Sequence, residues 1–290
     1  MGVAKIVGST NGNSSRPISL TASVVMYSAG SSSTSSQFQT YNGFLSGAST
    51  LYIPRFVRKY YCYNSGLTIQ NFSSVSTMVQ FAFTFNGTPY SWSQSIGANG
   101  ILGLYAPDIT SLNGVDGNLV GDRIGSGTIT VSSGGPIAAI VNEDNRGPNG
   151  VCAGGACGTC ETSNEGYGST LSAIPNGSQK TSVVFPQLQR KVNNIFSGGW
   201  TIQNTSTVNA TCTADYKAEN LSPISQNNIS LPANSQLTWY LPNVPNLSDG
   251  FNGAVTVSCN QAIFGIGNSA ARNLATYVGD SFVTYNGIGK

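Results

Sequence analysis

The sequence predicts an all-β protein: two tandem immunoglobulin-like antiparallel β-sandwich domains with an extra N-terminal strand. Three observations lead to this fold class. Apolar runs are short and separated by Gly, Asn, Pro and Ser; no window shows the 3.6-residue period of an amphipathic helix; and one pattern of runs occurs twice in the 290 residues. Each copy holds about six or seven short runs, which matches the strand number of one immunoglobulin-like sandwich.

The repeat covers most of the chain and keeps its order and spacing. The matching segments are 49–59 and 181–191, 66–71 and 199–204, 104–109 and 239–244, 127–132 and 253–258, and 137–142 and 263–268. We therefore expect an N-terminal extension over residues 1–39, a first β-sandwich repeat over 40–166, and a second repeat over 167–290 that ends with the start of a further repeat.

Each repeat is a succession of candidate strands. The apolar runs of the first copy lie near 51–57, 67–72, 77–85, 100–105, 127–132 and 136–142, and those of the second near 182–188, 200–204, 207–217, 235–241, 253–259 and 261–267. The run 77–85 is the most regular, because Val79, Phe81, Phe83 and Phe85 alternate with polar or small residues. Such alternation is typical of a strand with one face in the core and the other toward water.

Both ends of the chain resemble incomplete repeats. The motif Thr-Tyr-Asn-Gly at 40–43 opens the first copy and recurs at 284–287, while residues 17–24 resemble the strand that closes each copy. The chain thus begins with the tail of one repeat and ends with the head of the next, so we expect contacts at both ends. The candidate contact residues at the C-terminal end are Phe282, Thr284 and Tyr285.

The strand before the first repeat is a candidate assembly strand. Ile18, Leu20, Ala22, Val24 and Met26 fall on one of its faces, with polar residues opposite. Insertion into the incomplete sandwich of the next subunit would cover this face and join subunits head to tail. Two alternatives stay open: the strand folds back as an extra edge strand of its own chain, or the chain is an excerpt from a longer repeat array.

Composition argues against several classes of function. Charged residues make up 8% of the chain and the net charge is +2, which offers no electrostatic footprint for nucleic acid or an anionic membrane. The chain has no His, which removes His-dependent nucleophilic sites and His-bound metals. The adjacent carboxylates Glu143 and Asp144 would point to opposite faces of a strand, unlike a glycosidase pair. We expect a non-enzymatic protein without metal or cofactor, nucleic-acid partner or membrane insertion, located outside the cell or on its surface.

The cysteines divide into two groups. Cys212 and Cys259 both lie in expected strands of the second repeat, where a disulfide is the simplest interpretation. The other four are Cys62, Cys152, Cys157 and Cys160. They allow two further disulfides of undetermined connectivity. The last three also have the C-x4-C-x2-C spacing that resembles the cluster loop of plant-type ferredoxins, although the fourth ligand of that family has no match at the expected distance.

Several polar and aromatic residues are candidates for surface roles. Asn220 and Asn228 lie in glycosylation sequons within a polar stretch. A set of aromatic residues offers either a sugar-stacking platform or core and interface packing: Tyr60, Tyr61, Tyr63, Tyr90, Trp92, Trp239 and Tyr240. Basic residues recur at matching places of both copies, where they mark either a junction or a solvated turn: Arg55, Arg58 and Lys59, with Arg190 and Lys191.

The repeated motifs also carry a family resemblance. The segments 54–61, 67–71 and 136–143 resemble modules repeated in long bacterial cell-surface proteins, over most of residues 40–283. In architecture the chain is similar to donor-strand-assembled extracellular filament subunits. Both resemblances imply a structural role: a subunit of an extracellular filament, tube or sheath that polymerises head to tail with copies of itself through β-strand addition. The alternative is a carbohydrate-binding adhesin or stalk domain, with glycans as partners.

Overall fold

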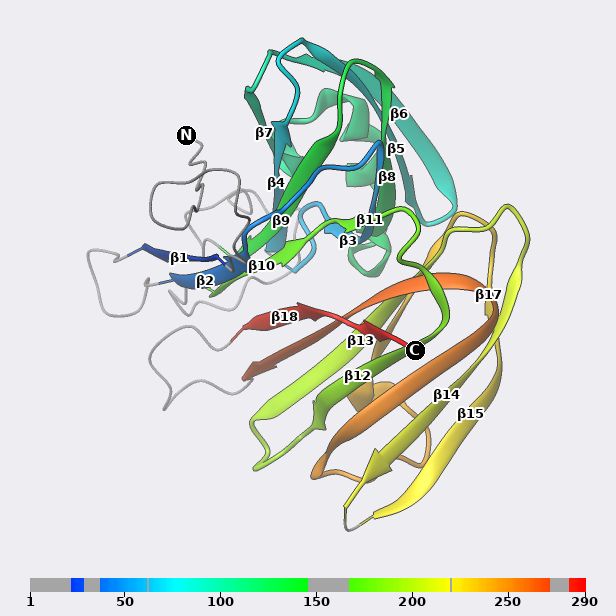
Figure 1. The fold of residues 1–290 in the computed structure, drawn as a ribbon. Helices are drawn as coiled ribbons and strands as arrows, with labels where there is room; N and C mark the ends of the chain where they lie inside the picture. Colours follow the sequence, from blue (N-terminus) through cyan, green and yellow to red (C-terminus); the bar gives the residue numbers. More distant parts are fainter. Residues whose placement is uncertain (1–21, 29–36, 62, 146–166, 220, 272–281) are drawn as a thin grey trace, which may run out of the picture.

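The computed structural model describes residues 22–28, 37–61, 63–145, 167–219, 221–271 and 282–290. This part of the chain is all-β, with antiparallel sheets in a sandwich-like arrangement (Figure 1), as the sequence predicts. Seven of the residues singled out above lie outside the described residues: Ile18, Leu20, Cys62, Cys152, Cys157, Cys160 and Asn220.

The first repeat forms two sheets together with β10 (Tyr167–Ser172) and β11 (Ile174–Pro175), the two strands that follow its predicted end at residue 166. Its own strands are β3 (Thr50–Val57), β4 (Tyr63–Asn71), β5 (Thr77–Phe85), β6 (Thr88–Ile96), β7 (Ile101–Tyr105), β8 (Ile124–Ser133) and β9 (Ile137–Asn145). One sheet has the order β11-β3-β8-β5-β6 and the other β10-β9-β4-β7. Three short 3-10 helices, η1 (Ala106–Asp108), η2 (Thr110–Gly117) and η3 (Val120–Asp122), fill the connection between β7 and β8.

The second repeat has the same strand order with one difference. Its elements are β12 (Lys180–Arg190), β13 (Phe196–Asn204), β14 (Ala210–Ala218), β15 (Leu221–Leu231), β16 (Gln236–Tyr240), η4 (Leu241–Asn243), β17 (Phe251–Ala271), β18 (Val283–Asn286) and β19 (Ile288–Gly289). The long strand β17 takes the places of both β8 and β9, because its first part pairs with β12 and β14 and its second part with β13 and β18. The predicted boundary at 166/167 stays a prediction, and β10 and β11, which follow it, pair with β9 and β3.

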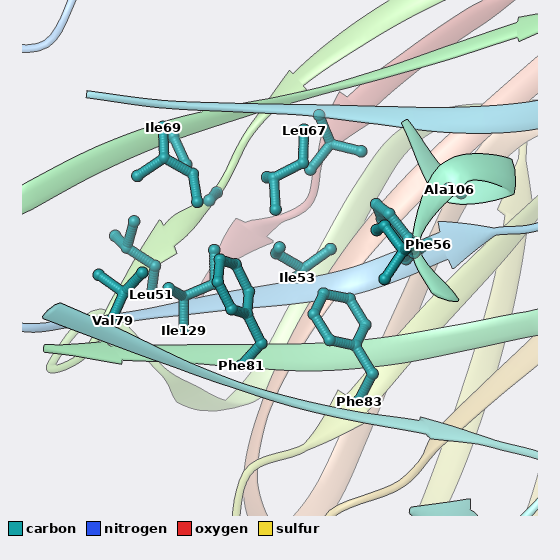
Figure 2. Close-up of a cluster of buried hydrophobic side chains, with 14 of the residues drawn as sticks. Leu51, Ile53, Phe56, Leu67, Ile69, Val79, Phe81, Phe83, Ala106 and Ile129 are labelled. Carbon is teal, nitrogen blue, oxygen red and sulfur yellow. The ribbon is translucent and has the colours of Figure 1, made fainter. Parts of the chain in front are cut away.

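The core of the first repeat is built from the inward faces of these strands (Figure 2). Val79, Phe81, Phe83 and Phe85 of β5 are buried, and the residues between them are exposed or half-buried, which confirms the predicted alternation. Trp92 of β6 lies opposite Phe81 in the register, and the two rings stack with centroids 4.6 Å apart. Aromatic burial of this kind supplies much of the apolar area that holds two sheets together.

The second repeat encloses its own core, and a polar chain runs through it. Trp200 donates from Nε1 to the Tyr216 hydroxyl at 3.2 Å, and that hydroxyl donates to Gln226 Oε1 at 2.8 Å. Burial raises the pKa of Tyr216 to about 12, with the hydrogen bond from Trp200 acting in the opposite direction. The core therefore satisfies these polar atoms with side chains from three strands, β13, β14 and β15.

The recurring basic pairs bind loops of their own repeat. Arg58 and Lys59 contact the Asp116 carboxylate, each at 2.8 Å, and Arg58 also donates to the carbonyls of Ala106 and Ile109. In the second repeat, Arg190 and Lys191 contact Asp249 in the same way, and Arg190 donates to the carbonyls of Leu241 and Val244. The pairs hold the connection that follows β7 or β16, and their role at a junction stays a prediction.

One buried asparagine in each repeat holds two connections: β4–β5 and β6–β7 in the first repeat, and β13–β14 and β15–β16 in the second. Asn71 donates to the carbonyls of Val75, Ile96 and Gly97, and accepts from the backbone N–H of Ser73. Asn204 makes the same set of contacts in the second repeat, with the carbonyls of Val208, Leu231 and Pro232. Although both asparagines begin a glycosylation sequon, each side chain is buried and fully hydrogen-bonded.

Candidate functional site

Three hairpins in the chain are equivalent. They are β9–β10, β17–β18, and an N-terminal pair formed by β1 (Ser23–Ser28) and β2 (Gln37–Asn42). Each is closed by the same backbone hydrogen bond: Gly43 N–H to Ala22 O at 2.8 Å, Ala173 N–H to Ala139 O at 2.9 Å, and Gly287 N–H to Gly265 O at 2.8 Å. The register counted from these bonds makes Thr40, Thr170 and Thr284 equivalent residues.

The surroundings of the three hairpins differ. β9 lies between β10 and β4, and the second part of β17 lies between β18 and β13. Among the described residues, β1 pairs with β2 alone. In the described part, β1 therefore pairs within its own chain, as one of the two alternatives for this strand expects. No described strand pairs with the other edge of β1, and an unpaired edge of this kind can bind a further strand.

The hairpins contact one another in sequence order, on one side of the molecule (Figure 1). Between the first and second, Thr170 Oγ1 donates to Gln39 Oε1 at 2.8 Å. Between the second and third, the Ser169 and Thr284 hydroxyls lie 2.7 Å apart, and Thr284 N–H donates to Ser169 Oγ. All four residues are buried, so these contacts exclude water.

The candidate assembly residues of β1 are half-buried. Ala22, Val24 and Met26 face the same side of the hairpin, as the alternation predicts. Val25 points to the opposite side and is 59% exposed. Val25 was not among the predicted contact residues, although the same alternation places it on the outer face.

The C-terminal candidate residues contact their own chain. The Phe282 ring lies 5.2 Å from that of Tyr63, Thr284 binds Ser169, and the Tyr285 hydroxyl donates to Gln187 O. Burial raises the pKa of Tyr285 to about 12, with its hydrogen bond acting in the opposite direction. Their contact with another subunit stays a prediction. The exposed apolar residue of this strand is Val283, which the sequence analysis did not name.

A buried ion pair lies beneath the middle hairpin. The Arg55 guanidinium donates to both oxygens of Glu143, at 2.8 and 2.6 Å, and both side chains are buried. Burial by itself lowers the pKa of Arg55, but the charge and hydrogen bonds of Glu143 outweigh it and raise that pKa. The pair joins β3 to β9 across the two sheets, and its spacing of 88 residues gives no local sequence signal.

The predicted disulfide between Cys212 and Cys259 is confirmed. The two residues lie directly opposite each other on β14 and β17, with Cα atoms 4.0 Å apart. A disulfide fits an oxidising compartment such as the cell exterior. No helix in the described part is long and apolar enough to cross a membrane. Within the same residues, no group of three or more Cys, Asp or Glu side chains could hold a metal ion.

The aromatic candidates do not form one platform. Trp92 and Trp239 lie in different repeats and stack on the core rings Phe81 and Trp200, at 4.6 and 6.1 Å between centroids. Each tryptophan lines an open groove beside the edge strands of its repeat, of about 620 Å³ at Trp92 and about 550 Å³ at Trp239. The groove at Trp239 also holds the glycosylation candidate Asn228, which is exposed on β15.

Comparisons with known proteins assign no family to the chain. No family model matches it, and no curated protein matches it significantly. Among solved structures, it is similar to the one titled "Crystal Structure of Thermotoga maritima 1070", with 14% sequence identity and a TM-score of 0.33 over 40% of this chain and 97% of that chain. A likeness at that TM-score carries no argument about function.

Proposed function

We propose that this protein is a structural, non-enzymatic subunit of an extracellular filament, tube or sheath. Copies of the chain polymerise head to tail through β-strand addition between subunits. Each repeat serves as one immunoglobulin-like sandwich, and the terminal hairpins supply the contacts. The partner of the protein is therefore itself.

The observation that carries this proposal is the difference between the N-terminal hairpin and its two equivalents. β9 and the second part of β17 have strands on both sides, whereas β1 has a strand on one side within the described residues. An edge strand with free backbone groups favours addition of a strand from another chain. Because the two ends of a chain carry different neighbours, the resulting contact is heterologous and propagates.

The extracellular location is supported by composition and by the disulfide. The chain has few charges and many small polar residues, and Cys212 is bonded to Cys259. Disulfides persist outside the reducing cytosol. A surface with few charges also limits the repulsion between closely packed copies.

Negative-stain electron microscopy tests the proposal. The purified full chain is imaged over a range of concentrations beside a variant that lacks residues 1–30, which removes β1. We expect filaments from the full chain and none from the variant. Filaments from both would retain the structural role but refute strand addition through β1, and monomers at every concentration would refute the proposed function.

Carbohydrate binding is a second candidate, favoured by the groove at Trp239. Gln226, Asn227 and Asn228 line the same groove as Trp239. An aromatic face beside amide side chains suits the apolar and hydroxyl surfaces of a sugar. Binding on a glycan array that is lost in Trp239→Ala and kept in Trp92→Ala would favour this function, and absence of binding would remove it.

A further inference from the structure

The contacts between successive hairpins follow one rule. The residue just before the equivalent threonine of one hairpin touches the threonine of the next. Gln39 precedes Thr40 and touches Thr170, and Ser169 precedes Thr170 and touches Thr284. The same contact thus occurs twice along the chain, between the first and second hairpins and between the second and third. In both cases the two residues that touch are buried.

The same rule leaves one residue uncovered at each end of the series. Within the described residues, no hairpin follows Val283, the residue before Thr284, and none precedes Thr40. Val283 is 55% exposed and Thr40 is exposed, whereas the residues joined by the rule are 6–9% exposed. If one more hairpin followed the third in the same way, its threonine would touch Val283. Thr40 is the equivalent threonine that has no such contact within the described residues.

The neighbours of these two residues extend the match. In the N-terminal hairpin, Val25 lies directly opposite Thr40 on the same face and is 59% exposed. In the C-terminal hairpin, Ser269 lies directly opposite Val283 and is half-buried. Each end therefore presents an exposed valine beside a small hydroxyl side chain, and neither patch carries a charge that would oppose its burial.

We infer that Val283 of one copy packs against Val25 and Thr40 of the next copy, so that the hairpin stack inside the chain continues from copy to copy. This inference rests on the head-to-tail assembly proposed above and names a face-to-face contact within it, independent of strand addition at β1. The occupant is a second copy because its N-terminal hairpin is the structural equivalent of the hairpin that already covers the end of the first repeat.

A charge at Val283 tests the contact. Val283→Asp would bury an unpaired carboxylate between subunits, so we expect the critical concentration for filament formation to rise by about tenfold or more. Val208→Asp is the matched control, because Val208 is 57% exposed and lies in the connection between β13 and β14, which belongs to none of the three hairpins. Both variants should retain the thermal unfolding temperature of the wild type, since both positions are at the surface.

Cross-linking tests the geometry directly. Chains with Thr40→Cys are mixed with chains with Val283→Cys under mild oxidation, and linked peptides are identified by mass spectrometry, which separates them from native disulfides. Thr40→Cys mixed with Val208→Cys is the negative control. Ser169→Cys with Thr284→Cys in one chain is the positive control, because the two hydroxyls lie 2.7 Å apart.

The outcomes separate this contact from the proposed function. Linked 40–283 dimers together with loss of filaments in Val283→Asp support both. Filaments that persist in Val283→Asp without a 40–283 link overturn the contact and leave the filament intact. Linked dimers without filaments from any variant keep the contact and refute the filament. Monomers without a link refute both, and point to another repeat or a different protein as the occupant.

Discussion

The ends of the two repeats differ in what covers them. In the first repeat, the hairpin β17–β18 lies over Ser169, and the ion pair between Arg55 and Glu143 is buried beneath. In the second repeat, Gln187 stands at the place of Arg55 and Ser269 at the place of Glu143. Val283, which lies opposite Ser269, is exposed. The same architecture thus holds a charged pair where a neighbour excludes water and uncharged polar residues where none does. Burial of a charge requires a partner, so the covered end is the more sensitive to mutation.

The largest effect that this comparison predicts comes from Glu143. Glu143→Ala leaves the Arg55 guanidinium buried without its partner, so we expect the free energy of unfolding to fall by about 3–5 kcal/mol. Ser269→Ala, at the equivalent place of the second repeat, removes one hydrogen bond to Gln189 and should cost about 1 kcal/mol. Urea denaturation measures both. Equal losses in the two variants would show that the covered end has no special sensitivity.

Removal of the disulfide should destabilise the second repeat and leave the first unchanged. Cys212→Ala with Cys259→Ala opens a crosslink between residues 47 apart, so we expect a loss of about 2–4 kcal/mol in the stability of the second repeat. In the first repeat, Val79 lies opposite Val131 at the matching place, so the first repeat should keep its own stability. Differential scanning calorimetry with and without reductant measures the change. A change of less than about one degree in the unfolding temperature of the second repeat would contradict the prediction.

The smallest expected effect concerns the loop carboxylates. Burial raises the pKa of Asp116, but the hydrogen bonds from Arg58 and Lys59 outweigh it and lower that pKa to about 2, from 3.8. A lowered pKa in the folded state adds stability above pH about 4 that is lost as the pH falls toward 2. Because Asp116 is partly exposed, solvent screening reduces this contribution to about 1 kcal/mol.

Asp116→Asn should therefore destabilise the protein at pH 7 and have little effect at pH 2. The hydrogen bonds from Arg190 and Lys191 also lower the pKa of Asp249, but that carboxylate is exposed. Asp249→Asn should accordingly show the same pH dependence with a smaller amplitude. Urea denaturation at both pH values measures it, and an Asp116→Asn effect that persists at pH 2 would contradict the assignment.

Local patterns in the sequence predicted the elements well. The alternation over 77–85 became β5, the matched segments became matching strands, and Cys212 pairs with Cys259. These features depend on residues that are neighbours in sequence or occupy matching places in two copies. The continuous strand β17 was not predicted, since the sequence shows two runs there, 253–259 and 261–267. In the structure they form one strand whose first part pairs with β12 and β14 and whose second part pairs with β13 and β18.

The candidate site was predicted in outline and missed in detail. The repeated motif at 40–43 and 284–287 located both terminal hairpins. The residues chosen at the C-terminal end, Phe282, Thr284 and Tyr285, contact their own chain, while Val283 and Val25 are the exposed ones. Alternation in the sequence shows that a strand has two different faces. Which of the two faces is buried depends on the neighbouring hairpin in space, and the alternation alone does not give that information.

The all-β class, the duplication and the disulfide could be predicted from the sequence, because alternation, repetition and matched cysteine positions are local or periodic properties. The tertiary structure alone decided which hairpin faces are buried, which carboxylate binds Arg55, and which edge of β1 stays unpaired in the described residues. Those outcomes depend on contacts between residues 88 or more positions apart, as for Arg55 with Glu143 and Gln39 with Thr170. Only the folded chain brings such residues into contact, and burial follows from that contact.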